Sequence, residues 1–274
     1  MFSTVSVDGV VQRWEDLRLQ DFAQGFFFGA GFFTTLLIDG GRPLFLARHL
    51  ARLRASLEVF PTAVRAPAPS LLQEDAVRDS LQRCLDADPL LGPGFTGVGK
   101  LAVSDGHVLC TFRPFAPDFE SLHRDGRGLD SVEPGAYRSA ERTVNHKGLA
   151  WFRQHALLPR LPLITNERDE VCELPTANLF VQFDGVLVTP PLASPCLPGI
   201  ARAVLLDVGH VAGLPVVERT VPLADVSRAQ ACFYSNAVAL AVGVPHLLGR
   251  ALPDSLRLAE QARAVLEARA LHED

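Results

Sequence analysis

The chain has 26 basic residues, and only two of them, Lys100 and Lys147, are lysines. Such a ratio is typical of a nucleotide bias that replaces lysine by arginine on solvated surfaces. Arginine cannot replace a lysine whose amine must lose its proton and attack a carbonyl, because a guanidinium stays protonated. The sequence therefore indicates Lys147 as a candidate nucleophile. We expect it at the start of a helix, where the positive terminus favours the neutral amine, and we expect Lys100 to be solvated.

A candidate carboxylate, Glu173, stands in the apolar run Val171-Cys172-Glu173-Leu174. Taken alone, this pattern is equally typical of a carboxylate on the exposed face of a strand. Glu173 becomes a candidate only in combination with the other features of the chain.

Three further segments are compatible with a ligand site. Gly199 precedes an apolar helix, and a glycine at a helix start lets backbone N–H groups approach a phosphate, although many loops contain Pro-Gly. The segment Gly25–Thr35 contains five phenylalanines, which indicate a buried strand, and its glycines suggest backbone close to a ligand. His49 and Arg52 lie beside the leucine face of a predicted helix, where solvated side chains are the simpler interpretation.

The elements that must position these residues are expected in two regions. Pro114 and Pro117 indicate a linker over 114–119. We expect an α+β fold with a smaller N-terminal domain over 1–113 and a larger C-terminal domain over 120–274 that carries Lys147. The expected elements are hairpins over 5–14, 99–112 and 178–189, strands over 32–38, 43–46, 163–166 and 231–234, and helices over 47–59, from Ser70, over 147–158, from about Gly199 and from Asp254.

Composition excludes several classes of protein. The chain of 274 residues is 48% apolar and 21% charged, as in globular proteins. Its net charge of −5 offers no strong basic field, so neither nucleic acid nor an anionic membrane is an expected partner. The apolar stretch 231–248 is interrupted by polar residues and predicts no membrane span. The N-terminus lacks a signal-peptide layout, and five scattered cysteines without a CxxC indicate the cytoplasm, with no metal site or disulfide framework.

The candidate residues occur in a specific order. In chain order the sequence has Gly29-x-Gly31-x-Phe33-x-Thr35, His49-x-x-Arg52-Leu53, Lys147, Glu173-x-x-x-x-Asn178-Leu179-Phe180, Leu197-x-Gly199-Ile200-x-Arg202 and Ser235-Asn236-Ala237. This set resembles the fold-type IV pyridoxal-phosphate enzymes, the class-IV aminotransferase family, over nearly the whole chain. The resemblance implies a two-domain fold, pyridoxal 5'-phosphate as cofactor, a small-molecule amino substrate and a homodimer.

The resemblance also implies roles for individual residues. Lys147 would attach covalently to the cofactor, Glu173 would keep the pyridine nitrogen protonated, and Arg52 would bind the phosphate. Further cofactor contacts would come from Asn178, Leu197, Gly199, Ile200, Ala201, Asn236 and Ala237, with Leu197 on the ring face and backbone N–H groups on the phosphate. The family pattern has Thr at the position of Ala201, so one hydroxyl contact to the phosphate is missing, which in principle weakens cofactor binding.

Within the family the chain is most similar to 4-amino-4-deoxychorismate lyase, which makes 4-aminobenzoate and pyruvate for folate biosynthesis. Phe33-Thr34-Thr35 and Asn236-Ala237 resemble the lyase, whereas aminotransferases more often carry Glu directly after that Phe. The hydroxyl of Thr34 or Thr35 would protonate the leaving oxygen. An aminotransferase acting on branched-chain or D-amino acids stays open, as do the exact substrate, its stereochemistry and the oligomeric state. A non-catalytic relative is disfavoured because both Lys147 and Glu173 are present.

Overall fold

The structure, a computed structural model, describes residues 4–92 and 94–273. Its packing divides the chain into two compact units. The first comprises residues up to Phe115 together with Lys147–Trp151, and the second comprises Ala116–His146 and Phe152–Glu273. Each unit combines sheets with helices, which confirms the predicted α+β class.

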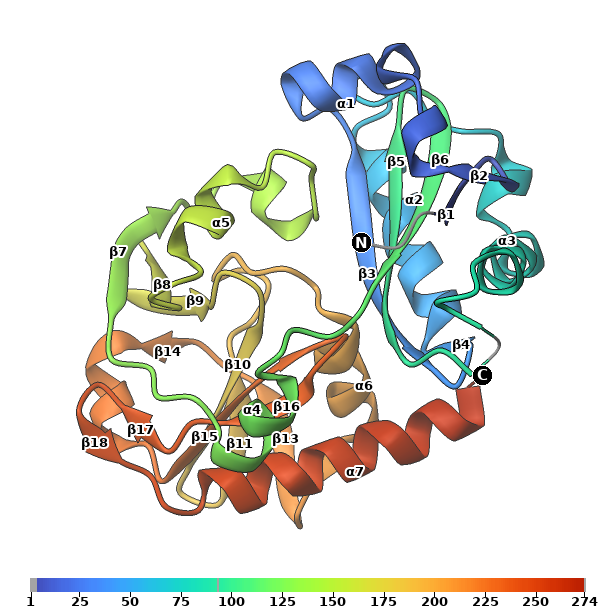
Figure 1. Cartoon of the computed structure of the whole chain (residues 1–274). Helices are drawn as coiled ribbons and strands as arrows, with labels where there is room; N and C mark the ends of the chain where they lie inside the picture. The colour runs from blue at the N-terminus through green and yellow to red at the C-terminus, as the bar shows by residue number, and fades with distance from the viewer. Residues whose placement is uncertain (1–3, 93, 274) are drawn as a thin grey trace. The chain divides into compact units, whose positions relative to one another are not determined.

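The first unit is built on a six-stranded antiparallel sheet (Figure 1). Across the sheet, the strands are β2 (Val10–Arg13), β1 (Thr4–Val7), β6 (His107–Arg113), β5 (Gly97–Ser104), β3 (Phe32–Asp39) and β4 (Arg42–Pro43). The predicted hairpins turn at Asp8–Gly9 and Asp105–Gly106, and all four residues have positive φ. An Asp-Gly pair predicts such a turn because both residues tolerate left-handed backbone.

Two helices, α2 (Leu46–Val59) and α3 (Glu74–Ala87), cover one face of this sheet. Alternate side chains of β3, such as Leu36 and Ile38, join the leucines of α2 in the core of the unit. Because side chains alternate along a strand, Phe33 and Thr35 lie on the other face of β3. The helix predicted over 47–59 is confirmed.

Two predicted elements of the first unit are wrong in their bounds. Ser70 does not cap the second helix, because Pro69–Leu72 form a separate short 3-10 helix, η3, and α3 begins at Glu74. The acidic first turn of α3 complements the positive helix terminus and favours this later start. The strand predicted over 43–46 is limited to Arg42–Pro43, since Phe45 has a φ of 55° and α2 begins at the next residue.

The phenylalanine-rich segment before β3 begins as a helix instead of a buried strand. The 3-10 helices η1 (Trp14–Asp16) and η2 (Leu19–Phe22) lead into α1 (Ala23–Phe28). In α1, Phe26, Phe27 and Phe28 are 67%, 65% and 74% exposed. Gly29 ends this helix with a φ of 65°, the left-handed conformation that terminates many helices.

The second unit contains a six-stranded and a four-stranded sheet. In sheet order, the first has β12 (His210–Val211), β13 (Leu214–Glu218), β11 (Val186–Thr189), β10 (Asn178–Phe183), β15 (Ala231–Asn236) and β16 (Leu240–Gly243), and the second has β14 (Val221–Pro222), β9 (Glu170–Glu173), β8 (Leu163–Asn166) and β7 (Val132–Tyr137). A small hairpin joins β17 (His246–Leu247) to β18 (Arg250–Ala251). The strands predicted over 163–166 and 231–234 and the hairpin over 178–189 are confirmed.

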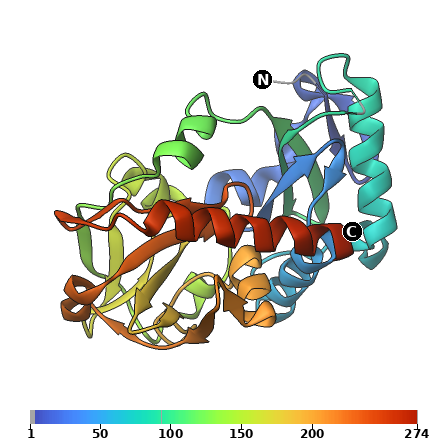
Figure 2. The ribbon, with the colours of Figure 1, turned by 90° about the horizontal axis from the view of Figure 1, so that it is seen from below.

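The described residues of the second unit form four α-helices and two 3-10 helices. They are α4 (Phe119–Asp125), η4 (Arg142–Asn145), α5 (Phe152–Leu157), α6 (Ile200–Val208), η5 (Leu223–Arg228) and α7 (Ser255–Glu273). The long helix α7, which crosses Figure 2, packs on β15 and β16, and α6 packs on β15. Both helices begin where they were predicted, directly after Gly199 and Asp254. Leu163 of β8 and Val181 of β10 belong to one core, which both sheets share.

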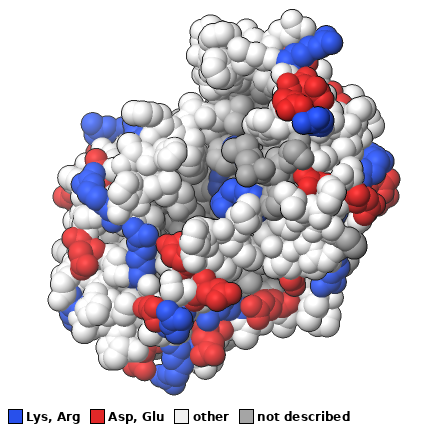
Figure 3. Space-filling view, viewed as in Figure 1, with Lys and Arg blue, Asp and Glu red and all other residues white. Residues whose placement is uncertain are grey.

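The charged side chains and the cysteines are distributed as the composition leads us to expect. Positive and negative side chains are interspersed on the face seen in Figure 3. All five cysteines are free and buried, as expected of small apolar thiols, and burial raises the pKa of Cys84 to about 12. Within residues 4–92 and 94–273, no helix combines the length and apolarity that a membrane span requires. The same residues contain no group of three or more His, Cys, Asp or Glu side chains suited to a metal ion.

Candidate active site

Lys147 lies in an extended segment that pairs with the chain around the start of β3. Its carbonyl oxygen accepts a hydrogen bond from the Phe33 N–H at 2.8 Å, and the Leu149 N–H donates to the Gly31 carbonyl at 2.9 Å. The prediction that Lys147 starts a helix is therefore wrong, and α5 begins only at Phe152. Pairing with the β3 segment satisfies the backbone groups of residues 147 and 149 in the extended form.

The amine of Lys147 lies over two aromatic rings that contact each other. Its Nζ atom is 5.1 Å from the ring centroid of Phe33 and 5.2 Å from that of Trp151. The two rings meet edge to face, with centroids 5.3 Å apart. The two rings cover part of the amine, and Lys147 is half-buried.

Gly31 allows this segment to approach. A Cβ atom at Gly31 would lie 2.5 Å from Cδ1 of Leu149 and 2.5 Å from the Val103 carbonyl oxygen. A side chain at this position would therefore displace the Leu149 side chain and the Val103 carbonyl. The glycine was expected to admit a ligand, and the structure shows that the chain itself makes the close approach.

Lys100 is not the solvated lysine that the sequence predicts. It stands within β5, opposite Thr35 of β3, and is only partly exposed. Its Nζ lies 4.3 Å from the ring centroid of Phe33, the ring that Lys147 also faces. Burial, followed by the positive charge of Arg113, lowers the pKa of Lys100. Both lysines of the chain therefore lie on the same face of β3.

Arg52, the predicted phosphate ligand, is held from the opposite face of β3. Its Nη2 donates to Oγ1 of Thr34 at 2.7 Å, and the same oxygen lies 2.5 Å from Nδ1 of His49. His49 is fully buried, and burial, followed by the charges of Arg52 and Lys147, holds its pKa well below the usual value. Burial also lowers the pKa of Arg52 to about 10. The simpler interpretation, that both side chains are solvated, is therefore wrong for His49, which is buried, while Arg52 is half-buried and hydrogen-bonded to Thr34.

The two threonines of β3 have different surroundings. Thr34 is buried on the α2 face, where its hydroxyl contacts Arg52 and His49. Thr35 is half-buried on the face of Phe33 and Lys100, and among the described residues its hydroxyl makes no hydrogen bond. Of the two predicted candidates for protonating a leaving group, Thr35 is therefore the one on the face of the amine.

Glu173 is a buried carboxylate held by hydrogen-bond donors on both oxygens. It ends β9 and is 6% exposed, so it is not the exposed strand residue that its pattern alone allows. Oε2 accepts from the Leu197 N–H at 2.9 Å and from Nδ2 of Asn178 at 3.5 Å, while Oε1 accepts from the Tyr137 hydroxyl at 3.1 Å. These donors fix the orientation of the carboxylate.

Asn178 joins this carboxylate to the loop that precedes α6. Its Nδ2 also donates to the Leu197 carbonyl at 2.9 Å. A Cβ atom at Gly199 would lie only 2.0 Å from Oδ1 of Asn178. Gly199 is therefore required for the loop to lie against Asn178, and the sequence motif of residues 173, 178, 197 and 199 forms one connected cluster.

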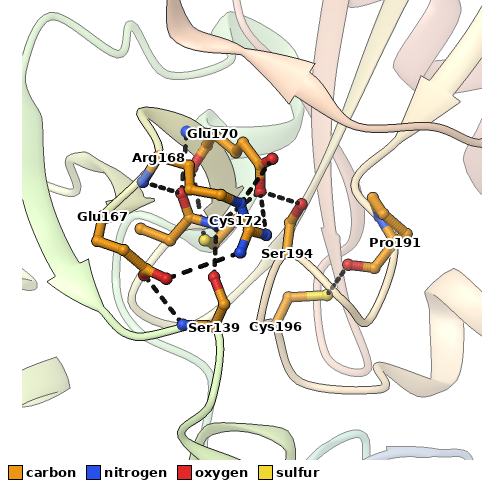
Figure 4. Close-up of polar contacts among 9 residues, drawn as sticks. Ser139, Glu167, Arg168, Glu170, Cys172, Pro191, Ser194 and Cys196 are labelled. Atoms are coloured by element: carbon orange, nitrogen blue, oxygen red, sulfur yellow. Dashed lines mark hydrogen bonds and ion pairs between the residues drawn. The ribbon is translucent and has the colours of Figure 1, made fainter.

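A second polar network anchors the same loop from the β8–β9 hairpin (Figure 4). Arg168 donates to both oxygens of Glu170, at 3.0 and 2.7 Å. Oε2 of Glu170 also accepts from Nδ2 of Asn166 at 2.7 Å and from the Ser194 hydroxyl at 3.1 Å. The hydrogen bond from Arg168, with those from Asn166 and Ser194, lowers the pKa of Glu170 to about 2. The hairpin therefore holds the loop three residues before Leu197.

The start of α6 and the end of β15 provide anion-binding groups. The first amides of a helix have no partner inside it, and here they belong to Ile200 and Ala201. Ser235 pairs with Asn178 across the sheet, and its hydroxyl is buried and unpartnered among the described residues. The Asn236 side chain accepts hydrogen bonds from the N–H groups of residues 238 and 239, at 2.9 and 2.8 Å. It therefore shapes the turn that contains Ala237.

Arg202 is the last residue of the motif that begins at Leu197, and its side chain holds the first turn of α6 in place. It is buried, and its Nη2 donates to the Pro190 carbonyl at 2.8 Å and pairs with the Glu218 carboxylate. These contacts fix the first turn of α6 to the end of β11 and to β13. Arg202 is thus a structural support of α6.

The residues present fit pyridoxal 5'-phosphate. The unpartnered Ser235 hydroxyl and the α6 amides suit a phosphate, whose oxygens accept hydrogen bonds. The buried Glu173 carboxylate suits a protonated ring nitrogen, and the amine of Lys147 suits an aldehyde. Alanine at 201 leaves the backbone N–H available.

Sequence reasoning did not identify several residues of these clusters. Tyr137 lies 36 positions before Glu173, and nothing in its local pattern indicates the contact. Asn145 donates to the Cys196 carbonyl at 2.7 Å, and only its position two residues before Lys147 was a signal. Ser235 was part of a quoted motif, but its buried, unpartnered hydroxyl is visible only in the structure.

Three known proteins illustrate what the chain is similar to. It is 24% identical to the branched-chain-amino-acid aminotransferase of Salmonella typhimurium over 253 residues, which cover 85% of this chain and 81% of that protein. A hypothetical aminotransferase from Mycobacterium tuberculosis, solved in a PLP-bound form, superposes with a TM-score of 0.80 at 21% identity, covering 97% and 99% of the two chains. The 4-amino-4-deoxychorismate lyase from Pseudomonas aeruginosa superposes with a TM-score of 0.75 at 23% identity, covering 96% and 97%.

The structural similarities confirm the predicted fold, and the comparison with family models identifies the family. The sequence model of amino-transferase class IV matches residues 31–247. That range contains every predicted catalytic and cofactor-binding residue, from Thr34 to Ala237, and this family's cofactor is the predicted pyridoxal 5'-phosphate. With more than half of its length matched by this one model, the chain belongs to the amino-transferase class IV family.

Proposed function

We propose that the chain is a pyridoxal-phosphate-dependent 4-amino-4-deoxychorismate lyase that produces 4-aminobenzoate and pyruvate. The observation that carries the proposal is the face of β3 shared by Thr35 and both lysines. Thr35 stands opposite Lys100, and both lysines lie over the ring of Phe33. A hydroxyl on the face of the amine suits an elimination, in which an oxygen leaving group must receive a proton.

The proposal gives each predicted residue a role toward the cofactor. Lys147 would hold the cofactor through its aldehyde, Arg52 would bind the phosphate, and Glu173 would keep a proton on the ring nitrogen. Leu197 would pack on the ring, while the start of α6 and the turn after β15 would donate N–H groups to the phosphate. When bound, the cofactor supplies an electron sink for the carbon that carries the substrate nitrogen.

Within the proposed reaction, the chain's own residues move two protons. The freed amine of Lys147 takes the proton from the carbon that bears the substrate nitrogen. Thr35 donates its hydroxyl proton to the enolpyruvyl oxygen as the carbon–oxygen bond breaks, and it recovers a proton from the Lys147 ammonium. The two products together contain all atoms of the substrate, so the reaction needs no second substrate.

Sequence similarity favours a second candidate, an aminotransferase. The 24% identity to a branched-chain-amino-acid aminotransferase extends over 85% of this chain. Transfer of an amino group to a 2-oxo acid, from a branched-chain or D-amino acid, would use the same lysine, arginine and carboxylate but would not need the Thr35 hydroxyl.

An assay without any 2-oxo acid separates the two candidates. The purified enzyme is supplied with 4-amino-4-deoxychorismate, and pyruvate is followed with lactate dehydrogenase. The lyase releases pyruvate for many turnovers, because elimination restores the starting form of the cofactor. Absence of pyruvate, together with steady turnover of D-alanine or a branched-chain amino acid once 2-oxoglutarate is added, would establish the aminotransferase instead.

Variants of Thr35 extend the assay to the residue that carries the proposal. Thr35→Val should reduce pyruvate release strongly, by about 100-fold, the typical contribution of a positioned proton donor. Thr35→Ser retains the hydroxyl and should stay close to the wild-type rate. Equal rates for the two variants would remove Thr35 from the mechanism.

The proposal also includes a homodimer in the cytoplasm, serving folate biosynthesis. Sedimentation of the purified protein at several concentrations measures its mass. A mass of one chain at every concentration would remove the homodimer from the proposal.

A further inference from the structure

Tyr137 is a buried tyrosine whose hydroxyl contacts the Glu173 carboxylate. It ends β7 and is 1% exposed. Its hydroxyl donates to Oε1 of Glu173 at 3.1 Å and accepts from Nε2 of Gln154 at 3.4 Å. The Arg153 guanidinium lies 6.0 Å from the centre of its ring, and Nη1 of Arg153 donates to the Ala136 carbonyl at 2.7 Å. The ring is therefore fixed by contacts from α5.

The hydroxyl is a donor in this pair. Burial, followed by the Glu173 charge, raises the pKa of Tyr137, so the phenol keeps its proton near neutral pH. A carboxylate has no proton to donate and accepts on both oxygens. With Tyr137 on Oε1 and the Leu197 N–H on Oε2, Glu173 is clamped from two sides and cannot rotate without breaking one of these hydrogen bonds.

We propose that Tyr137 is a positioning residue that holds Glu173 in the orientation in which its carboxylate meets the ring nitrogen of the cofactor. This inference rests on the role that the proposed function gives to Glu173. It does not depend on whether the reaction is an elimination or a transamination, because both need the protonated ring. Gln154 supports the same orientation, since it donates to the Tyr137 oxygen and leaves the hydroxyl proton for Glu173.

The chain offers a matched control. It contains two tyrosines, and the second, Tyr234, is also buried in the second unit. Tyr234 lies next to Ser235 on β15, so its side chain points to the opposite face of the sheet and joins the core. Tyr→Phe at either position removes one buried hydroxyl from the same unit, but only Tyr137→Phe removes a donor to Glu173.

The experiment measures the affinity of the apoenzymes for two probes, pyridoxal 5'-phosphate and its analogue with C–H in place of the ring nitrogen. Tyr137→Phe should bind pyridoxal 5'-phosphate about 10- to 100-fold more weakly than wild type, the range for losing a hydrogen bond to a charged group. It should bind the analogue within about twofold of wild type, because the analogue has no nitrogen for Glu173 to hold. Tyr234→Phe should change neither affinity by more than about twofold.

Three outcomes would overturn the inference. Wild-type affinity of Tyr137→Phe for pyridoxal 5'-phosphate would show that the hydroxyl does not position Glu173. An equal loss for both probes would show a general structural role. A wild-type protein that binds neither probe would overturn the proposed function as well, whereas the first two outcomes leave it standing.

Discussion

Asn145 donates a hydrogen bond through Nδ2 to the Cys196 carbonyl at 2.7 Å. Asn145 ends η4, two residues before Lys147, and Cys196 immediately precedes Leu197 in the loop before α6. The contact therefore connects the chain leading to the candidate nucleophile with the loop that contacts Glu173. A second, longer hydrogen bond from the same amide reaches the Leu192 carbonyl at 3.4 Å.

Replacing Asn145 should weaken this connection in a graded way. Asn145→Ala loses the donor, which should cost about 1 kcal/mol of unfolding free energy. Asn145→Asp should cost more, because a carboxylate would then face a carbonyl oxygen. Denaturant unfolding of the apoenzymes measures both values, and cofactor titration should show the same order of loss. If both variants match wild type, the contact does not support the loop.

Reduction with borohydride should place the cofactor label on Lys147. The purified protein should be yellow, and peptide mapping after reduction should find the labelled peptide around residue 147. Lys147→Ala should lose the covalent label and the activity. Lys100→Ala should retain the label, although both amines lie over the ring of Phe33. A label on Lys100 would reverse the assignment of the two lysines.

Glu173→Gln should preserve the fold and reduce turnover by about 100-fold or more. Glutamine is nearly isosteric with glutamate: its amide oxygen can still accept from the Leu197 N–H and its amide nitrogen can donate to the Tyr137 oxygen, so that only the Tyr137 hydroxyl proton loses its acceptor. The unfolding free energy should therefore change by about 1 kcal/mol or less. Turnover and thermal unfolding of the variant measure the two effects separately. Normal turnover would show that Glu173 serves the fold alone.

Protonation of Glu170 at low pH should weaken its hydrogen bond to Ser194, in the loop before α6. Its pKa is lowered to about 2 in the folded protein, so its hydrogen bonds stabilise the fold above the ordinary pKa of 4.5, and this contribution is lost as the pH falls toward 2. At pH 7, Glu170→Gln should lower the melting temperature by about 2–4 °C. The difference from wild type should shrink between pH 5 and pH 2.

Glu133→Gln is the control for this pH dependence. Its ion pair with Arg160 is partly exposed, with the Arg160 side chain 58% exposed, so the variant should melt close to wild type across the range. A melting difference for Glu170→Gln that is constant from pH 7 to pH 2 would contradict the assignment of the effect to the Glu170 charge.

Local signals predicted the turns and many of the strands and helices. Asp8–Gly9 and Asp184–Gly185 form the expected hairpins, since the backbone geometry depends on those two residues alone. The helix predicted from Lys147 is wrong because a distant segment decides its conformation. Gly31 and Phe33 lie more than 110 positions earlier and hold residues 147–149 extended. Periodicity in a window around Lys147 carries no information about that pairing.

Local sequence also predicted some residues of the site, whereas contacts between distant segments determine the surroundings of others. The ordered motif indicated Arg52, Glu173 and Gly199, but helix periodicity suggested that Arg52 and His49 face solvent. The structure buries His49 because Thr34 presents a hydroxyl to it from β3. Tyr137 reaches Glu173 through the arrangement of β7, β8 and β9, which no single stretch of sequence reveals.

The alternation of β3 makes its two adjacent threonines non-equivalent. The Phe33 N–H donates to the Lys147 carbonyl at the start of the strand, and the register that follows places the outward Thr35 opposite Lys100. A one-residue deletion between Gly29 and Phe33 would turn Thr34 outward and Thr35 toward Arg52. Each face of the strand would still carry one threonine after such a slip, but Phe33 would leave the face of the two lysines. The identity of the aromatic neighbour, and not of the hydroxyl, is therefore what would report the slip.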